Sequence, residues 1–288
     1  MENMKKALSL ICIIIIGIIV INCQNRKSNQ TQNKPLIIVS VPPYISIVQA
    51  IAGDSVVVHS AIQPNFDPHT MEITPKQVVL IQKASLFIAI GEPFERKLCS
   101  ALQKKGNILQ LNEKIPTLYY TDSNASAKKW QDNHFWLSLK RLPVQVKFIT
   151  DVLSRMNPND SDMYRERANL YIEKIKKLDK KIEKDLYPYQ KKALLVSHPA
   201  LNYLCVDYGL EQIAVEWEGK SPLPKEISHI MNLAEKSNIV CAFTFSQFNN
   251  KGVKWIADKL NIHIENIDPL DRDPLKTIEK IVLFITKS

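Results

Sequence analysis

Glycine is scarce in this sequence, at seven of 288 residues, or about 2% against a usual 7%. The seven are scattered, and no glycine-rich loop exists. P-loops and Rossmann folds need closely spaced glycines so that the backbone can approach a phosphate. Gly219-Lys220-Ser221 resembles the end of a P-loop, but Ala214 stands where the first glycine would be. The sequence therefore argues against a nucleotide site of either class.

Cysteine is also sparse, with five in the chain, and no pair has the close spacing of a zinc or redox motif. Cys205 and Cys241 are able to pair in an oxidising compartment, but buried free thiols explain them at least as well. The cysteines therefore give no sign of a zinc or redox motif.

Charge of one sign is not concentrated enough to indicate a polynucleotide partner. The formal net charge is +9, but much of the excess lies in the segment 173–185, where lysines alternate with acidic residues. This interleaving is typical of the solvated face of a helix. We expect no nucleic-acid binding.

The N-terminus has the features of an export signal. Lys5 and Lys6 precede an uncharged, mostly aliphatic run of 15 residues over 7–21. A membrane-spanning helix needs about 20 such residues, so the run suits a signal peptide better.

The end of this run resembles a bacterial lipoprotein signal, in which a cysteine follows an aliphatic residue at −3. The sequence is Val20-Ile21-Asn22-Cys23, and Asn22 departs from the usual small residue. We expect a signal peptide over 1–22, lipidation of Cys23 and a polar tether over 23–34. The alternatives are an uncleaved anchor and ordinary cleavage nearby. The prediction is an exported, membrane-anchored lipoprotein in the periplasm or at the cell surface.

Short β-branched runs alternate with helical patterns in both halves of the remaining chain, which is typical of an α/β fold with parallel sheets. In the first half we expect strands over 35–41, 55–62 and 86–90, with helices over 44–51, from 74 and over 95–105. In the second half we expect strands over 193–196, 212–215, 239–243 and 264–267, with helices over 200–207, 225–236, 252–260 and from 275.

One long helix separates the two halves. Asp160 or Ser161 can begin it, and Pro188 ends it. Its apolar positions recur every three or four residues, forming one stripe: Tyr164, Ala168, Tyr171, Ile175, Leu178, Ile182 and Leu186. We expect an N-terminal lobe over 35–157, a linking helix over 158–187 and a C-terminal lobe over 188–288.

Three of the six histidines are placed for ligand binding. His69, His134 and His198 lie in loops where an α/β lobe exposes side chains to a cleft, and Asp268 ends a predicted strand. Three imidazoles and one carboxylate suit zinc. Each ring would bind as the neutral form, so affinity should fall with pH. Three other histidines lie within or at the ends of predicted strands and helices and are expected to be surface or packed residues: His59, His229 and His263.

Several segments, in order along the chain, resemble the zinc/manganese solute-binding proteins of ABC importers, the cluster A-I family. They are Val39-Ser40-Val41-Pro42-Pro43, Asp67-Pro68-His69-Thr70 with Thr74-Pro75-Lys76-Gln77, Asn133-His134-Phe135-Trp136-Leu137, Ser197-His198-Pro199-Ala200, Glu218-Gly219-Lys220-Ser221-Pro222 and Ile267-Asp268-Pro269-Leu270.

The resemblance implies two α/β lobes joined by one long helix, with the metal ion between them. Carried over by motif, the ligands are His69, His134, His198 and Asp268. A histidine at position 198 favours Zn²⁺, with Mn²⁺ as the alternative, because manganese-preferring members tend to have a carboxylate there. The resemblance also implies small lobe motion, a monomer, an ABC-transporter permease in the cytoplasmic membrane as partner, and no enzymatic activity.

The sequence departs from the family pattern at three places. Asn133 replaces a proline and Ser138 an acidic residue beside His134, and Phe245 stands where many relatives have glutamate. The histidine-rich loop of many zinc-specific members is absent from 119–132.

Two other functions compete with transport. A zinc hydrolase needs an open coordination position and a general base, for which Glu72 is the candidate. Asp268 as a fourth ligand would fill that position. A surface lipoprotein of this family can also act as an adhesin, independently of the metal site.

Overall fold

The computed structural model describes residues 34–63, 66–103, 105–121, 129–216 and 223–288. Pro35–Ser288 forms a compact unit by itself. The predicted signal peptide, Cys23 and nearly all of the predicted tether lie outside the described residues, as does the Glu218–Pro222 motif. No helix within the described ranges is both long and apolar enough to cross a membrane.

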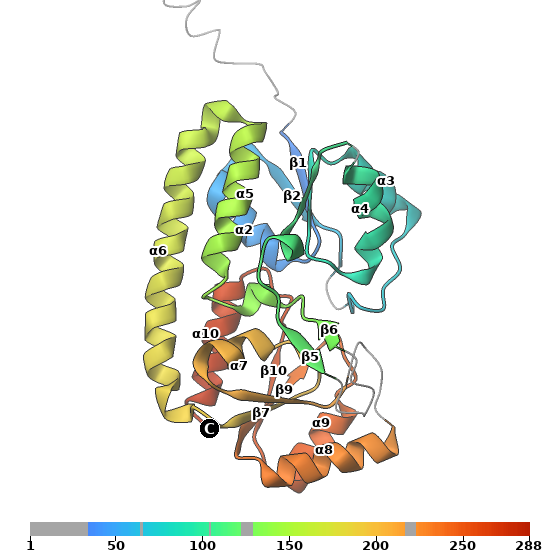
Figure 1. Cartoon of the computed structure of the whole chain (residues 1–288), viewed down its shortest axis with the longest axis vertical. Helices are drawn as coiled ribbons and strands as arrows, with labels where there is room; N and C mark the ends of the chain where they lie inside the picture. Colours follow the sequence, from blue (N-terminus) through green and yellow to red (C-terminus); the bar gives the residue numbers. More distant parts are fainter. Residues whose placement is uncertain (1–33, 64–65, 104, 122–128, 217–222) are drawn as a thin grey trace, which may run out of the picture. The chain divides into compact units, whose positions relative to one another are not determined.

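A parallel four-stranded sheet with the order β2-β1-β3-β4 organises the first half of the unit (Figure 1). Its strands are β1 (Leu36–Val39), β2 (Val57–Ser60), β3 (Leu86–Ala89) and β4 (Ile108–Gln110), and its helices are α2 (Pro43–Ala52), α3 (Pro75–Lys83) and α4 (Arg96–Gln103).

The second half repeats this architecture, with a parallel sheet in the order β10-β9-β7-β8. Its strands are β7 (Ala193–Val196), β8 (Glu211–Ala214), β9 (Ile239–Phe245) and β10 (Ile264–Ile267), and its helices are α7 (Asn202–Tyr208), α8 (Pro224–Lys236), α9 (Lys251–Lys259) and α10 (Pro274–Ile285). Every strand and helix that the sequence predicted in either half is present.

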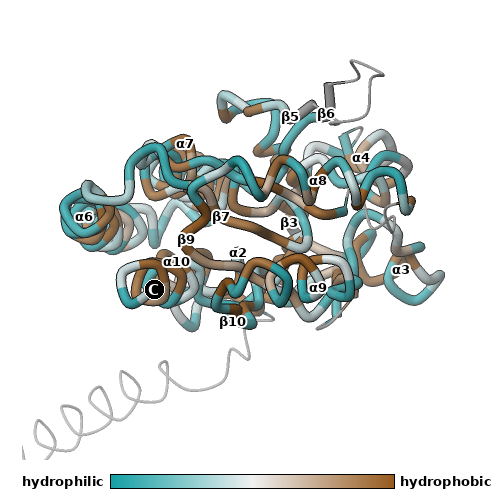
Figure 2. The backbone as a smooth tube through the Cα atoms, turned by 90° about the horizontal axis from the view of Figure 1, so that it is seen from below, coloured by the Kyte–Doolittle hydropathy of each residue, from teal (hydrophilic) through white to brown (hydrophobic). Residues whose placement is uncertain are grey.

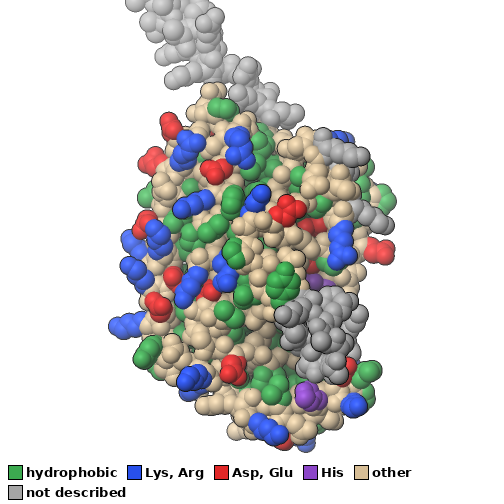
Figure 3. Space-filling view, in the orientation of Figure 1, with side chains coloured by type: hydrophobic (Ala, Val, Ile, Leu, Met, Phe, Trp, Pro, Cys, Tyr) green, Lys and Arg blue, Asp and Glu red, His purple; other side chains and the backbone are tan. Residues whose placement is uncertain are grey.

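The long helix α6 (Ser161–Leu186) packs against α5 (Leu142–Met156) and α2 of the first half and against α10 of the second (Figure 1). Its exposed side carries interleaved basic and acidic side chains (Figure 3). The buried stripe contains Ile172, and Tyr171 is only half-buried. The prediction was wrong at this position because the 3.6-residue period turns the core-facing stripe from Tyr171 to its neighbour.

The central strands of each sheet are buried on both faces, and their side chains alternate between two cores because the strand period is two residues. In β1, Ile37 and Val39 join the largest core, whereas Ile38 faces a separate core with α3 and α4. In the second half, Leu194 joins the largest core and Leu195 faces α8 and α9. The largest core runs through both halves and α6, and the strands β7 and β9 are accordingly hydrophobic in Figure 2.

The predicted fold class is therefore confirmed: two α/β lobes with parallel sheets joined by one long helix. The sequence did not lead us to predict α5, β4 or an antiparallel hairpin of β5 (Tyr119–Thr121) and β6 (Lys129–Gln131). Short 3₁₀ helices fill several connections: Gly53–Ser55, Pro93–Glu95, Leu111–Glu113, Phe135–Leu137, Pro158–Asp160 and Tyr187–Tyr189.

Candidate metal site

His69 lies in the loop between β2 and α3. Its backbone N–H donates to Asp67 Oδ1 at 2.9 Å, an Asx turn that fixes the loop just before the ring. The loop then enters α3 through a capping box, in which Thr74 accepts the N–H of Gln77 and the Gln77 side chain accepts from Thr74. Turn chemistry on one side and helix capping on the other thus hold His69 in place.

His134 precedes the 3₁₀ turn Phe135–Leu137 and is buried. Asp132 Oδ1 accepts the His134 backbone N–H at 2.9 Å and lies 2.8 Å from Nδ1 of the ring. Asp132 is in turn held by α7, because Asn202 donates to its Oδ2 at 3.1 Å and the Tyr203 hydroxyl to its carbonyl at 2.8 Å. The second lobe therefore helps to orient a ligand that precedes the linking helix.

His198 follows β7 and is fully buried. Its Nδ1 lies 2.5 Å from Oε1 of Glu216, which follows the neighbouring strand β8. The adjacent Ser197 hydroxyl accepts the backbone N–H of Phe245 at 3.1 Å. The parallel pairing of β7 with both β8 and β9 thus places the ring at the carboxyl edge of the sheet.

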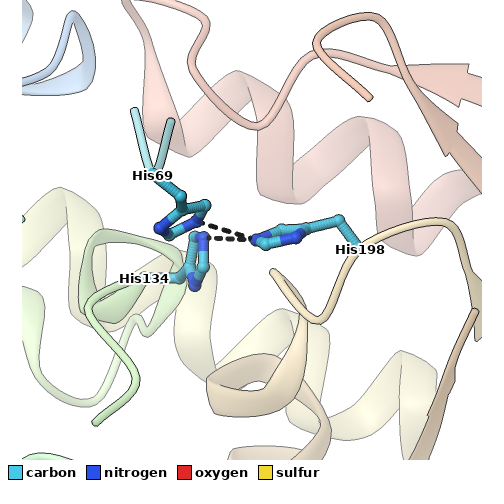
Figure 4. A group of neighbouring side chains, drawn as sticks. All are labelled: His69, His134 and His198. Carbon is cyan, nitrogen blue, oxygen red and sulfur yellow. Dashed lines mark hydrogen bonds between the residues drawn. The ribbon is translucent and has the colours of Figure 1, made fainter. Parts of the chain in front are cut away.

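The three imidazoles converge on one point, each with its Nε2 (Figure 4). Nε2 of His198 lies 3.0 Å from Nε2 of His69 and 3.2 Å from Nε2 of His134. Zinc binds histidine nitrogens at about 2.0–2.1 Å in tetrahedral geometry, which separates two ligand nitrogens by about 3.3 Å. The observed spacings are close to this value, so the geometry fits a small divalent cation.

The opposite ring nitrogen of every histidine in this group faces a buried carboxylate. Nδ1 of His69 lies 3.1 Å from Glu92 Oε2, and Asp132 and Glu216 hold the other two rings. A carboxylate on the outer nitrogen fixes the tautomer and turns Nε2 toward the ion, an arrangement typical of histidine metal ligands. Three negative charges also lie around the point where a cation would sit.

The protonation of the rings follows from these contacts. Burial lowers the pKa of His69, but the charge and hydrogen bond of Glu92 outweigh it and raise the pKa to about 9. Burial and the neighbouring His69 and His134 hold the pKa of His198 well below its usual value. His198 is therefore neutral and offers a lone pair, as ligation requires.

Asp268 does not join the histidine group, whose ligand atoms all lie within 4.8 Å of one another. Its Oδ1 accepts from Gln247 Nε2 at 2.7 Å and from the backbone N–H of Leu270 at 2.8 Å. The structure thus brings together three of the four predicted ligands, and Asp268 as a ligand stays a prediction.

The remaining histidines and the candidate general base lie elsewhere. His59, His229 and His263 are exposed, as expected of residues outside the site. Glu72 is also exposed and lines a separate cavity with Phe66 and Met71.

Sequence reasoning missed the three outer carboxylates Glu92, Asp132 and Glu216. A signal for them was present, because Glu92 and Glu216 follow strands as Asp268 does, and Asp132 precedes its histidine by two residues as Asp67 does.

Two of the residues that depart from the family pattern also form contacts near the site. Asn133 donates to Glu92 Oε1 at 3.4 Å, and the Ser138 hydroxyl donates to the Asp207 carboxylate of α7.

Comparison with known proteins agrees with this geometry. The family model of ZnuA, the periplasmic component A of a zinc-uptake complex, matches residues 37–280. A putative metal-binding protein of Chlamydia trachomatis is 29% identical over 249 residues, covering 85% of this chain and 88% of its own length. The manganese ABC transporter substrate-binding lipoprotein PsaA of Streptococcus mitis is 27% identical, covering 91% of this chain and 88% of its own.

Among solved structures, a crystal structure of ZnuA superposes with a TM-score of 0.79 at 27% identity, covering 88% of this chain and 99% of that one. The family match extends from β1 into α10 and includes all three histidines. This chain therefore belongs to the ZnuA family of metal-binding ABC-transporter components.

Proposed function

We propose that this protein is an extracytoplasmic receptor that binds one Zn²⁺ ion at His69, His134 and His198 and delivers it to an ABC importer. The observation that carries the proposal is the convergence of three Nε2 atoms, with a buried carboxylate against the outer nitrogen of each ring. Asp268 is the proposed fourth ligand, by its place in the family motif.

The donor set supports zinc over manganese. Imidazole nitrogens suit zinc, whereas manganese prefers carboxylate and other oxygen ligands. Relatives include both a zinc-uptake component and a manganese-binding lipoprotein, so manganese is the alternative cargo. The competition is decided by measuring both ions on the same protein.

Delivery requires the receptor to stay near its permease. We propose that Cys23 carries a lipid that anchors the chain to the membrane, since the residues around it resemble a lipoprotein signal and a relative is named as a lipoprotein. Cys23→Ser should abolish incorporation of labelled palmitate and release the protein from the membrane fraction. Retention of both label and membrane attachment would contradict the anchor.

Metal binding is tested by titrating the purified protein with Zn²⁺ and Mn²⁺ in competition with a chromophoric chelator. We expect one ion per chain, tighter binding of Zn²⁺, and loss of binding in His69→Ala and His198→Ala. His229→Ala is the matched control, because this histidine is exposed on α8. Equal stoichiometry and affinity in all three variants would overturn the ligand assignment.

Transport is tested in the producing bacterium by following uptake of radiolabelled zinc with the gene deleted. Uptake should fall when the gene is removed and return with the wild-type gene, but not with His198→Ala. Restoration by the His198→Ala gene would contradict the proposed function.

A further inference from the structure

One short loop of the second lobe contacts both the histidine cluster and Asp268. It covers Ser246–Asn250, between β9 and α9. Phe248 stacks on the His198 ring with centroids 4.0 Å apart and planes 5° from parallel, and the neighbouring Gln247 donates to Asp268. Two adjacent side chains thus reach two different parts of the site.

Phe248 covers the site from one side. Its ring centroid lies 6.3 Å from that of His69 as well, so it lies against rings of both lobes. The side chain is half-buried, with one face on the imidazole. An apolar ring in this position excludes water from the ligand nitrogens and strengthens the electrostatic interactions there.

The loop that carries Phe248 is held in shape by Asn250. The Asn250 side chain accepts the Phe245 N–H at 3.2 Å and donates to the carbonyls of Phe245 at 2.9 Å and Phe248 at 3.0 Å. Phe248 is therefore placed by a closed set of hydrogen bonds and not by its stacking alone.

Gln247 holds Asp268 by a hydrogen bond of 2.7 Å to Oδ1. The other end of the same amide, Oε1, is buried and has no hydrogen-bond partner among the described residues. Leaving a buried amide oxygen without a hydrogen bond costs free energy. The Gln247 side chain therefore keeps its hydrogen bond to Asp268 in an orientation that leaves its own oxygen unpaired. A cation that recruits Asp268 must compete with this donor.

We infer that the Ser246–Asn250 loop controls release of the metal ion, with Phe248 slowing its departure and Gln247 restraining Asp268 from completing the coordination. This inference rests on the proposed function. The two side chains act in opposite directions, and this suits a receptor that must hold an ion securely and still give it up. Both are positioning residues, because they act through His198 and Asp268.

The test measures the rate at which Zn²⁺ passes from the loaded protein to an excess of chelator. Phe248→Ala should release zinc several-fold faster, while Phe248→Tyr, which keeps the stacked ring, should behave as wild type. Trp255→Ala is the control for loss of an exposed aromatic side chain on the adjacent helix α9. A wild-type release rate in Phe248→Ala would overturn the role of Phe248.

Gln247→Leu should release zinc more slowly and bind it more tightly, because Asp268 then lacks the side-chain donor that restrains it. Cobalt substituted for zinc reports the ligand set, and its visible absorption should change in Gln247→Leu as Asp268 joins. Asp268→Asn added to Gln247→Leu should cancel both effects. Faster release in Gln247→Leu, or effects that persist without the Asp268 carboxylate, would overturn the role of Gln247.

The outcome separates this inference from the function on which it rests. Failure of the wild-type protein to bind zinc would remove the proposed function itself. Tight wild-type binding with unchanged release rates in Phe248→Ala and Gln247→Leu would remove only the role of the loop.

Discussion

A single carboxylate oxygen of Asp132, Oδ1, holds His134 at two points, because it accepts the backbone N–H at 2.9 Å and lies 2.8 Å from Nδ1 of the ring. Asp67 stands in the same place before His69 and accepts that backbone N–H at 2.9 Å, but the His69 ring turns to Glu92 instead. The two Asp-x-His segments therefore form the same turn, and only one of them also orients its own ligand.

This difference gives a matched pair of substitutions. Asp132→Asn should weaken zinc binding by about 10–100-fold, as loss of an outer carboxylate does. The reason is that a neutral amide lacks the negative charge that the carboxylate places beside Nδ1 of the ring. Asp67→Asn should have a much smaller effect, since an asparagine oxygen still accepts the backbone N–H of an Asx turn. Chelator competition measures both. Equal losses in the two variants would show that the turn, and not the ring contact, sets affinity.

Zinc should stabilise the folded chain strongly. The buried carboxylates of Glu92, Asp132 and Glu216 bring negative charge to the site, and a divalent cation offsets it. At about 1,000 times Kd, binding adds about 4 kcal/mol to the free energy of unfolding. A chain of this size should gain about 2–4 °C in Tm for each kcal/mol.

Thermal unfolding in zinc and in a chelator measures this gain. His198→Ala should unfold at nearly the same temperature in both solutions. A Tm for the wild type that does not respond to zinc would contradict a specific site.

The helices and strands that the sequence predicted are those whose residues form one clear hydrophobic pattern. The strand beginning at Leu36 is rich in β-branched residues and buried on both faces, and α6 carries an apolar stripe over its whole length. The helix α5 has a comparable pattern, because its buried face recurs at helical spacing through Leu142, Val146, Ile149 and Leu153. Its existence was therefore also predictable from the sequence.

The sequence predicted those parts of the site that depend on the position of a single strand or loop. His69 and His198 follow predicted strands and His134 lies in a loop near the lobe boundary, and these positions made the three histidines candidate ligands. The contact of Glu216 with His198 depends on β8 lying beside β7, and that of Gln247 with Asp268 on β9 lying beside β10. Strand order was not predicted, so no inference from single strands could have found these pairs.

Glu95 should make stability depend on pH. Burial raises the pKa of its carboxyl from 4.5 to about 7, opposed by hydrogen bonds from Ser40 and the backbone and reinforced by the charge of Glu92. A raised carboxyl pKa means that the folded state keeps the proton more readily than the unfolded state. The favourable contribution is present below pH 4.5 and is lost as pH rises through about 7.

The loss is on the order of 3 kcal/mol, from 1.36 kcal/mol for each unit of pKa. Urea unfolding of the wild type and of Glu95→Gln between pH 5 and 8 measures it in a chelator. The stability of Glu95→Gln should fall less over this range. Parallel curves for the two proteins would show that Glu95 does not titrate there.

Trp136 ties the segment of His134 to the segment of Asp268. Its buried indole N–H donates to the carbonyl of Pro269 at 2.9 Å, so a hydrogen bond joins the two lobes two residues beyond one ligand and one beyond another predicted ligand. Trp136→Phe keeps an aromatic ring but leaves that carbonyl without its donor, which should cost about 1–3 kcal/mol of unfolding free energy. Because the hydrogen bond also fixes the approach of the two segments, zinc affinity should fall when it is lost.

Urea unfolding and zinc titration of Trp136→Phe measure both effects. Trp255→Phe, on the exposed face of α9, is the control. Loss of stability with unchanged zinc affinity would show that this bond supports the fold without positioning the site.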